Sequence, residues 1–308
     1  MKKTVIFIIT LAGILSAFAC KKDETTETTP SLSGLIISEA VPYVAKGDVV
    51  VFKANVAGLL TSDGTDPGII GLYWQVNSAK KDTLSRNIKT ENPDFEYSVD
   101  SLGTYQVSCY AFTDKDHNFY NASAVTSFQA IDPANALTGI GQDATVIIGG
   151  KEWTAMNLDS TTYGVSHKGS DVTAPLFGRF FTWEEASAAC PSGWHLPTAE
   201  EWDALGKDVS GLMAPAKFLD EDMWKAALGQ SITNSTGFNA IPVGYLDNTA
   251  SIDKFRLYGE MASFWTASDS AQDATQAQFR FIRYDNPEIM KGSGDKTSLA
   301  LSVRCVKD

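Results

Sequence analysis

The positions of four cysteines constrain the fold of this chain more than any other feature, because its N-terminus predicts secretion. The cysteines lie at positions 20, 109, 190 and 305 of 308 residues. Lys2 and Lys3 precede a mostly apolar stretch at residues 4–19, which ends in Ala-Phe-Ala. This order is typical of a secretory signal peptide, and the stretch is shorter than the roughly 20 residues of a membrane-anchoring helix. Since secreted proteins form disulfides, we expect cysteines that share a module to pair.

Cys20 follows the predicted cleavage site, so the signal peptide covers residues 1–19. The segment LSAFAC resembles a bacterial lipoprotein signal, which implies lipidation of Cys20; the alternative is an ordinary secretory signal with the same cleavage site. The charged residues 21–24, KKDE, are similar to the export signal of surface lipoproteins in Bacteroidetes. Residues 20–30 predict a disordered tether, because the ten residues after the cysteine are not apolar. We therefore expect a protein of the outer membrane, anchored by lipid and facing the cell exterior.

The charge of the chain excludes one class of partner. Its formal net charge is −12, whereas a nucleic-acid-binding protein needs a basic surface for the phosphates. We therefore expect no nucleic acid as a partner.

Residues 31–131 predict an all-β sandwich. Short apolar runs rich in β-branched and aromatic residues lie at 47–56, 68–76, 95–99 and 102–112, and turn residues such as Asp63-Gly64 separate them. Short strands at this spacing favour an immunoglobulin-like fold. The order GDVV, WQV and LGTYQVSCYAFTD resembles a PKD-type domain, which implies a spacer. Cys109 has no cysteine partner on an earlier strand, so we interpret it as a small buried hydrophobe.

A linker of small residues, 132–143, leads to a second module at 144–308 that holds six of the seven tryptophans. Thr182 and Thr198 each stand three positions before a glutamate, which is the capping-box pattern of a helix start. The first helix should end near Cys190. Apolar residues at 202, 205 and 209 continue the second at helical spacing. Residues 298–306 predict a C-terminal strand.

Cys190 stands five residues before His195, and this pair allows three interpretations. A cysteine nucleophile with a histidine base needs a free thiol and a third, orienting group. A zinc site needs further ligands, which no CxxC or HxxxH spacing supplies. A disulfide to Cys305 would use the two cysteines of this module and close a loop of roughly 115 residues. We favour the disulfide and expect no catalytic and no metal-binding residue.

Five segments of the second module resemble, in order, the Fibrobacter succinogenes major paralogous domain. They are VIIGGKEWTAMNLD (146–159), FGRFFTWEEASAACPSGWHLPTAEEW (177–202), GFNAIPVGYL (237–246), FWTASD (264–269) and SVRCVKD (302–308). The resemblance implies an α+β, C-type-lectin-like domain, in which two helices flank a looped antiparallel sheet. It also implies a long-range disulfide from the first helix to the last strand, which agrees with pairing Cys190 and Cys305.

Candidate ligand-binding residues are aromatic rings that can stack on sugars and polar groups that can bond to hydroxyls. They are Trp224, Tyr245, Asp247, Asn248, Tyr258, Trp265, Asp269, Asp285 and Asn286. Trp224 lies in a variable insertion and is the best surface candidate, whereas Trp265 lies in a motif patterned like core. C-type lectins often hold sugar through Ca²⁺, but residues 286–288 (NPE) reverse the family's run, so we do not expect this cofactor.

These features together favour a surface-anchored, non-enzymatic lipoprotein that binds glycan or polysaccharide. The alternative is an adhesin or outer-membrane assembly component whose ligand is a cell-surface protein. An enzyme is a third hypothesis, and it depends on Cys190 near His195.

Overall fold

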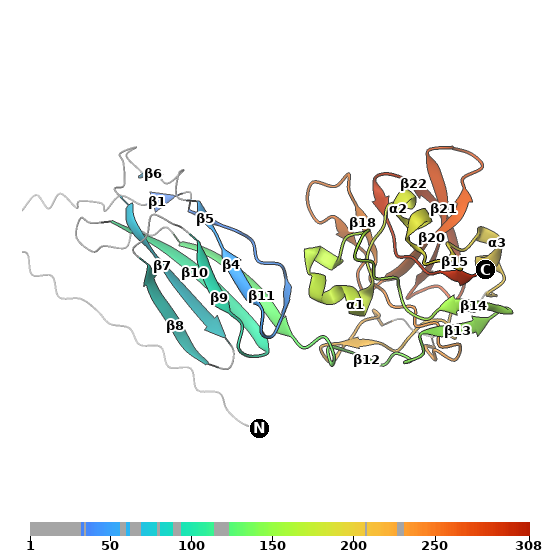
Figure 1. Ribbon diagram of the computed structural model, residues 1–308, viewed down its shortest axis with the longest axis horizontal. Helices are drawn as coiled ribbons and strands as arrows, with labels where there is room; N and C mark the ends of the chain where they lie inside the picture. Colours follow the sequence, from blue (N-terminus) through green and yellow to red (C-terminus); the bar gives the residue numbers. More distant parts are fainter. Residues whose placement is uncertain are drawn as a thin grey trace, which may run out of the picture.

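The structure is a computed structural model (Figure 1), and it describes residues 32–33, 35–55, 60–61, 69–78, 81–88, 94–113, 123–206, 208–226 and 231–308. The predicted signal peptide, Cys20 and the predicted tether lie outside these residues. Figure 1 shows an elongated strand-rich body and a rounder one, joined where β11 (Ser123–Ile131) leads into β12 (Leu137–Thr138).

The first body is built from strands wherever the structure describes it. They are β1 (Leu32–Ser33), β2 (Ile36–Ile37), β3 (Tyr43–Ala45), β4 (Val49–Phe52), β5 (Ala54–Asn55), β6 (Leu60–Thr61), β7 (Ile69–Ser78), β8 (Lys81–Ile88), β9 (Phe95–Ser98), β10 (Gly103–Thr113) and β11. The main sheet has the order β3-β11-β10-β7-β8, in which β3 is parallel to β11 and the other pairs are antiparallel. The pairs β4–β9 and β2–β5 lie against it, and β1 pairs with β6.

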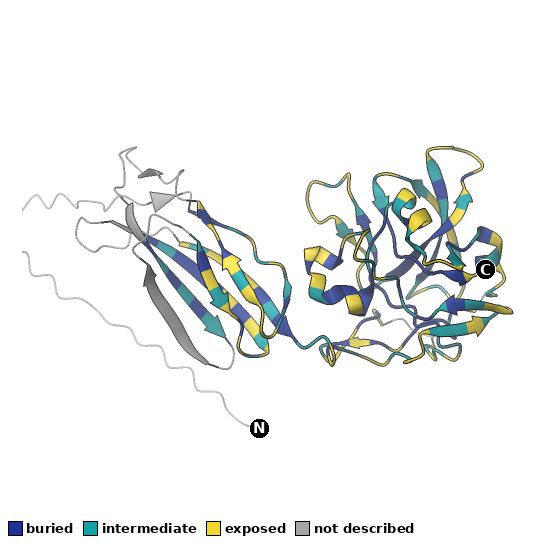
Figure 2. Cartoon of the chain, in the orientation of Figure 1, coloured by how far each residue is buried: buried dark blue, intermediate teal, exposed yellow. Residues whose placement is uncertain are grey.

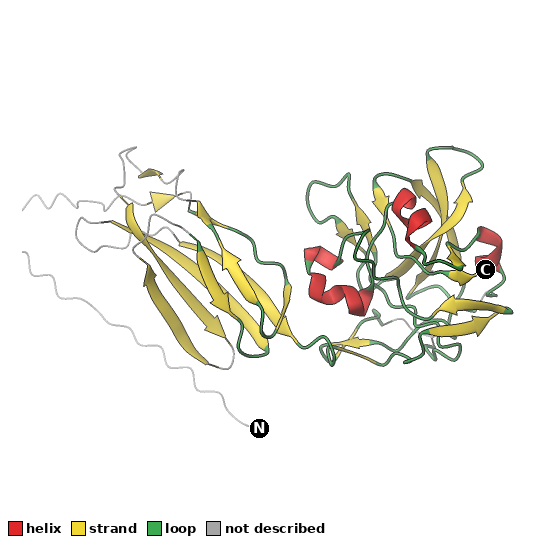
Figure 3. Cartoon of the chain, in the orientation of Figure 1, coloured by secondary structure: helices red, strands yellow, loops and turns green. Residues whose placement is uncertain are grey.

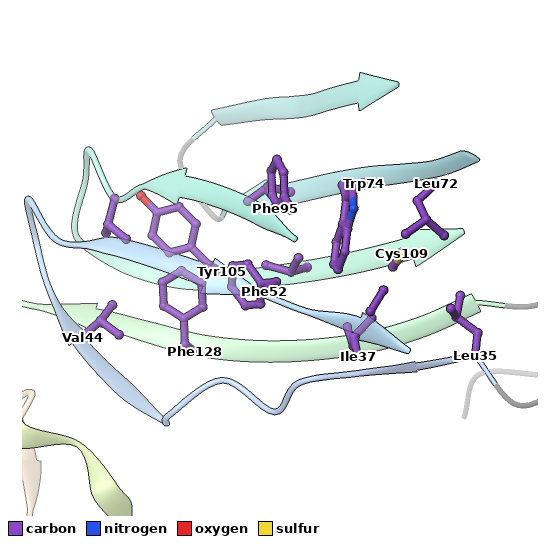
Figure 4. Packing of buried hydrophobic residues seen from close by; sticks show 14 of the residues in the cluster. Leu35, Ile37, Val44, Phe52, Leu72, Trp74, Phe95, Tyr105, Cys109 and Phe128 are labelled. Carbon is purple, nitrogen blue, oxygen red and sulfur yellow. The ribbon is translucent and has the colours of Figure 1, made fainter. Parts of the chain in front are cut away.

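Aromatic side chains fill the space between the main sheet and the short pairs (Figure 4). Trp74 of β7 stacks on Phe95 of β9 with 5.2 Å between ring centroids, and Tyr105 of β10 stacks on Phe128 of β11 at 4.9 Å. Cys109 lies opposite Trp74 in the β10–β7 register and is fully buried with a free thiol. The prediction of a buried, unpaired Cys109 is confirmed.

The Cys109 thiol should be almost inert in the folded protein. Burial raises the pKa of this thiol to about 12, so the reactive thiolate is scarce at neutral pH. With Cys20 replaced by serine, we expect a thiol reagent to modify Cys109 at least 100-fold more slowly in buffer than in urea, measured by mass spectrometry. Modification at equal rates would contradict the burial.

The second body combines short helices with small sheets (Figure 3). Its helices are η1 (His167–Gly169) and η2 (Asp171–Thr173), both 3₁₀, then α1 (Ala174–Phe177), α2 (Trp183–Ala189) and α3 (Ala199–Asp203). Its strands after β12 are β13 (Thr145–Ile148), β14 (Lys151–Thr154), β15 (Trp194–His195), β16 (Lys217–Phe218), β17 (Glu221–Asp222), β18 (Tyr245–Asp247), β19 (Phe255–Arg256), β20 (Met261–Asp269), β21 (Gln276–Arg283), β22 (Met290–Asp295), β23 (Leu299–Ala300) and β24 (Val306–Lys307). They form the sheets β12-β16-β17, β13-β14-β24-β15, β19-β18-β23 and β20-β21-β22.

The described chain is therefore mostly β, with several small sheets and few helices. Among the described residues, we find no helix with the length and apolar character that crossing a membrane requires.

Both predicted capping boxes begin helices. Thr182 accepts a hydrogen bond from the Glu185 amide at the start of α2, and Thr198 accepts one from the Glu201 amide at the start of α3. Cys190 ends α2 as predicted. The prediction that the second helix continues to residue 209 is wrong, because α3 ends at Asp203. Gly206 has a φ of +88°, which an α-helix does not adopt.

The C-terminal strand closes the second body. β24 pairs with β14 on one side and β15 on the other, and Cys305 just before it is bonded to Cys190. The predicted disulfide is confirmed, with 5.8 Å between the two Cα atoms. The predicted continuous strand over 298–306 is instead two short strands, β23 and β24, because the amides between them bond to separate partners. Residues 300–306 are all buried (Figure 2).

The predicted linker packs as part of the second body. β12 pairs with β16, and the Gly141 amide donates to Asn239 Oδ1 at 2.7 Å. Ile131 at the end of β11 is already buried in the second body's apolar cluster. The linker segment therefore contributes to packing of the second body.

Candidate functional site

A hollow on the second body lies beside a tight hairpin. Strands β16 and β17 are joined by Leu219 and Asp220, both with positive φ, as a two-residue type I′ turn requires. Lys217 and Asp222 face each other across this hairpin, and their side chains form an ion pair at 2.6 Å. The hairpin therefore fixes the position of the segment that follows, which carries Trp224.

Trp224 forms one wall of this hollow, which we call the Trp224 pocket. Its volume is about 280 Å³, and its lining residues are Pro215, Ala216, Asp222, Trp224, Lys225, Ala226, Ile232 and Tyr284. This volume is near the lower end of the range for small-molecule sites. It suits one small ring or side chain.

Chain segments far apart in sequence build the pocket. The Lys225 amide donates to the Gly259 carbonyl, and the Tyr284 amide, just after β21, donates to the Glu260 carbonyl. The Lys225 ammonium lies 3.2 Å from a Glu260 carboxylate oxygen and 5.4 Å from the centre of the Tyr284 ring. The hydrogen bond to Glu260 raises the pKa of Lys225, so the ammonium stays charged at neutral pH.

Charges around the pocket occur in opposite pairs. Asp222 pairs with Lys217, and Lys225 pairs with Glu260. Arg283 pairs with Asp285 at 3.0 Å, and its guanidinium lies 5.9 Å from the Tyr284 ring centre. The three ion pairs around the pocket supply charged hydrogen-bonding groups, and their charges cancel.

Trp224 is not the surface ring that the sequence predicts. Only 6% of the residue is exposed and it belongs to a buried apolar cluster, so it lines the pocket with little of its surface. Its indole Nε1 is buried without a hydrogen-bond partner among the described residues. An unpaired buried N–H costs about 1–3 kcal/mol of folding free energy. In the described part of the chain, Trp153 and Trp202 of the core also have an unpaired indole nitrogen, so this feature does not distinguish Trp224 as a binding residue.

The predicted residues of the β18 segment lie apart from this pocket. Tyr245 packs against the cluster that contains Trp265. Asp247 accepts hydrogen bonds from the amide and hydroxyl of Thr249, and the Asn248 amide donates to the Ser298 carbonyl. These groups stabilise the turn after β18.

The protein covers the groups of Tyr258 and Trp265 that would have to contact a ligand. Tyr258 is 38% exposed, but burial of its hydroxyl raises the pKa of that group, so the phenol end is the covered end. Trp265 is fully buried, and its Nε1 donates to the Phe181 carbonyl at 2.8 Å. We correct the assignment of Trp265 as a binding platform, because no face of its ring is open to a ligand.

The predicted acidic and amide residues fall at three places. Asp269 pairs with Lys296 at 2.6 Å, and Asn286 Oδ1 accepts the Glu288 amide within a tight turn. Asp285 pairs with Arg283 beside Tyr284, and it does not line the Trp224 pocket. Of the predicted set, only Trp224 lines this pocket.

Besides Trp224, the pocket has three polar or aromatic lining residues, and sequence reasoning missed all three: Asp222, Lys225 and Tyr284. Two of them flank Trp224 in the insertion that marked it as a candidate, so proximity in sequence was an available signal. Tyr284 directly precedes Asp285, but no local pattern connects this turn to Trp224. That connection depends on how β21 packs.

The disulfide removes the Cys190 thiol from any Cys-His pair. His195 instead lies between two carboxylates, with Nδ1 2.7 Å from Asp308 and Nε2 3.1 Å from Glu201. Partial burial lowers the pKa of His195, but hydrogen bonds to Asp308 and Glu201 outweigh it and raise the pKa overall. Its role here is to connect the chain end to the capping box of α3. Among the described residues, no group of three or more His, Cys, Asp or Glu side chains could hold a metal ion.

Comparison with known families accounts for the second body. Residues 146–307 match the model of the Fibrobacter succinogenes major domain. The chain belongs to this family. No curated protein matches it. The Trp224 pocket, the disulfide and the paired strands β14, β15 and β24 all lie within the Fibrobacter succinogenes major domain.

Proposed function

We propose that the protein is a non-enzymatic glycan-binding lipoprotein of the cell surface, and that the Trp224 pocket takes a single sugar unit. The observation that carries the proposal is the pairing of two aromatic rings, Trp224 and Tyr284, with the polar groups of Asp222 and Lys225 in one hollow. Apolar rings with a few placed polar groups are the usual make-up of small-ligand sites. Because the surrounding charges are paired, a neutral glycan fits better than an anionic one.

The first body supports an immunoglobulin-like, PKD-type spacer. Its main-sheet order, with β3 parallel to β11 and the β4–β9 pair opposite, resembles that of an immunoglobulin-like sandwich. The Tyr105 hydroxyl donates to the Ser101 carbonyl at 2.9 Å, which is the arrangement of a tyrosine corner. A compact spacer next to a lipid at Cys20 would hold the second body away from the membrane.

The second body supports a C-type-lectin-like head. Strands β13 and β14 share a sheet with the C-terminal β24, and a disulfide connects Cys190 at the end of α2 to Cys305 just before β24. This disulfide is the one that the family resemblance implies.

Removing the Tyr284 ring should weaken glycan binding. In the secreted chain with Cys20 replaced by serine, we expect Tyr284→Ala to lower affinity about 10-fold, and Asp222→Asn by several-fold, because each removes a contact inside the pocket. The measurement is calorimetry on neutral glycans selected from a broad array. Tyr163→Ala is the matched control, since Tyr163 is 37% exposed on the same body and does not line the pocket.

Two results would count against this proposal. A folded chain that binds no glycan on the array would remove the function. Glycan binding that Tyr284→Ala leaves unchanged would place the site elsewhere.

A protein ligand is the second candidate function, and one observation favours it. β13 lies at the edge of its sheet, and Ile147 at its centre is 77% exposed. An exposed apolar edge strand can pair with a strand of another protein. Cross-linking on intact cells that joins β13 to a neighbouring outer-membrane protein would support this alternative.

A further inference from the structure

Tyr43 of the first body contacts the second body beside Ile131, which is buried in the second body's apolar cluster. Its amide donates to the Ser170 hydroxyl at 3.0 Å, and its ring lies edge-on to Phe218 with 5.1 Å between ring centroids. Ser170 is only 1% exposed and connects η1 to η2. The junction between the bodies is therefore formed by a backbone hydrogen bond and an aromatic pair as well as by the covalent chain.

His167 lies directly behind this contact. Its carbonyl accepts the Ser170 amide at 3.0 Å, which places Ser170 to receive Tyr43. Its ring is 5.7 Å from Phe177, and Phe177 in turn is 4.8 Å from Phe218. One backbone connection and one row of rings thus lead from His167 to Tyr43.

The surroundings of His167 favour the uncharged form of its imidazole ring. The residue is 3% exposed, and its Nδ1 is buried without a hydrogen-bond partner among the described residues. Its ring neighbours are aromatic and come from α1, the segment after it, and the β19 region: Phe177, Phe180, Phe255 and Tyr258. None of these four side chains carries a negative charge that could pair with a protonated His167.

None of the titratable and charged groups near His167 that follow would stabilise a protonated His167 ring. Lys168 is its chain neighbour and is positive. Tyr258 packs on the ring, with Tyr43 beyond it, and the pKa of each phenol is raised by burial, so both stay neutral in acid. Asp171 of the flanking η2 and Arg179 of the loop after α1 pair with each other at 3.0 Å. Arg256 of β19 adds no negative charge.

We propose that this junction is an acid-sensitive latch, in which protonation of His167 releases Tyr43 and uncouples the two bodies. A charged imidazolium in the aromatic cluster has lost its hydration and has no carboxylate partner among these rings, so a movement of η1 that exposes it to water becomes favourable. That movement takes Ser170 away from the Tyr43 amide. The orientation of the second body on its spacer would then be fixed at neutral pH and free in acid.

The size of the effect follows from the shift in proton affinity. Burial, with a smaller contribution from Lys168, lowers the pKa of His167 to about 4 from an ordinary 6.5. Between pH 6.5 and about pH 4, the closed junction therefore binds fewer protons than the open junction. The closed state consequently loses stability relative to the open state as the pH falls through this range. Linkage then raises the opening equilibrium constant about 20-fold at pH 5 and about 100-fold at pH 4, relative to pH 7.

The test measures the distance between the bodies. Spin labels on Val125→Cys and Ile147→Cys, both exposed positions on different bodies, report this distance in the otherwise complete secreted chain with Cys20→Ser. Cys109 is buried, and Cys190 and Cys305 are bonded, so labelling is restricted to the new cysteines. We expect one narrow distance distribution at pH 7.5 that broadens as the pH falls to 4.

Two variants keep the result interpretable. His167→Phe retains a ring but cannot be protonated, so its distribution should stay narrow at pH 4. Ser170→Ala removes the acceptor for Tyr43, so opening in this background should be measurable even where the parent chain stays closed. The proposal is overturned if the distribution is unchanged by pH in both the parent and Ser170→Ala chains. It is equally overturned if His167→Phe broadens as much as the parent.

Discussion

Replacing both Cys190 and Cys305 with alanine should lower the free energy of unfolding of the second body by about 5 kcal/mol. The bond joins residues 115 positions apart, and chain-entropy arguments give a loop of this length close to that value. The loss should be concentrated at the C-terminal strand, because β24 has few backbone bonds of its own to β14 and β15. Few globular domains exceed 5–15 kcal/mol in total, so the variant should be partly unfolded at 37 °C.

The measurement is urea unfolding followed by tryptophan fluorescence. Six of the seven tryptophans lie in the second body, so the signal reports that body rather than the whole chain. This choice matters because a chain with two bodies need not unfold in one step. Cys109→Ala is the matched control: it removes a buried thiol from the first body, and we expect it to leave the tryptophan transition nearly unchanged. A loss below 2 kcal/mol in the double variant would show that packing alone holds the C-terminal segment in place.

Features that depend on local or pairwise rules could be predicted from the sequence. The capping boxes at Thr182 and Thr198 need only a threonine and a glutamate three positions later, and both are present. The Cys190–Cys305 bond followed from the secretion signal and from counting the cysteines in one module. Buried Cys109 followed from its place in an alternating strand.

Features that depend on distant packing could not be predicted. The extent of α3 depends on the turn at Gly206, and helical spacing of apolar residues over 202–209 gave no warning of it. The Trp224 pocket needs Tyr284, which lies 60 positions further along the chain and reaches the pocket only through the packing of β21. Trp265 and Trp224 both look like candidate rings in sequence, but only Trp224 lines a hollow.

Arg304 is the clearest case of a residue whose sequence context misleads. It follows Val303 and precedes Cys305 in the C-terminal run, where alternation would turn a charged side chain toward water. Instead it is fully buried. Its guanidinium donates to Asn157 Oδ1 at 2.9 Å and to the carbonyls of Thr154, Phe238 and Asn239 at 3.0, 2.6 and 3.0 Å.

Arg304→Met should therefore cost about 3–5 kcal/mol of stability, although methionine is apolar and the site is buried. The substitution leaves three carbonyls and one amide oxygen without their donor, and buried acceptors without partners are expensive. It also removes the guanidinium from the Phe238 ring, whose centre is 4.4 Å away. Arg304→Lys should cost less, about 1–3 kcal/mol, because an ammonium can satisfy some of the acceptors but lacks the planar fork that reaches all four.

The same fluorescence-detected urea unfolding measures this effect, and Arg283→Met is its matched control. Arg283 pairs with Asp285 near the surface, and exposed ion pairs contribute about 0–1 kcal/mol. The expected order of loss is Arg304→Met, then Arg304→Lys, then Arg283→Met. If Arg304→Met were as stable as the parent chain, the four acceptors would have to receive hydrogen bonds from water or from other donors of the protein. The guanidinium would then not be what holds the segments around residues 154–157 and 238–239 to the C-terminal strand.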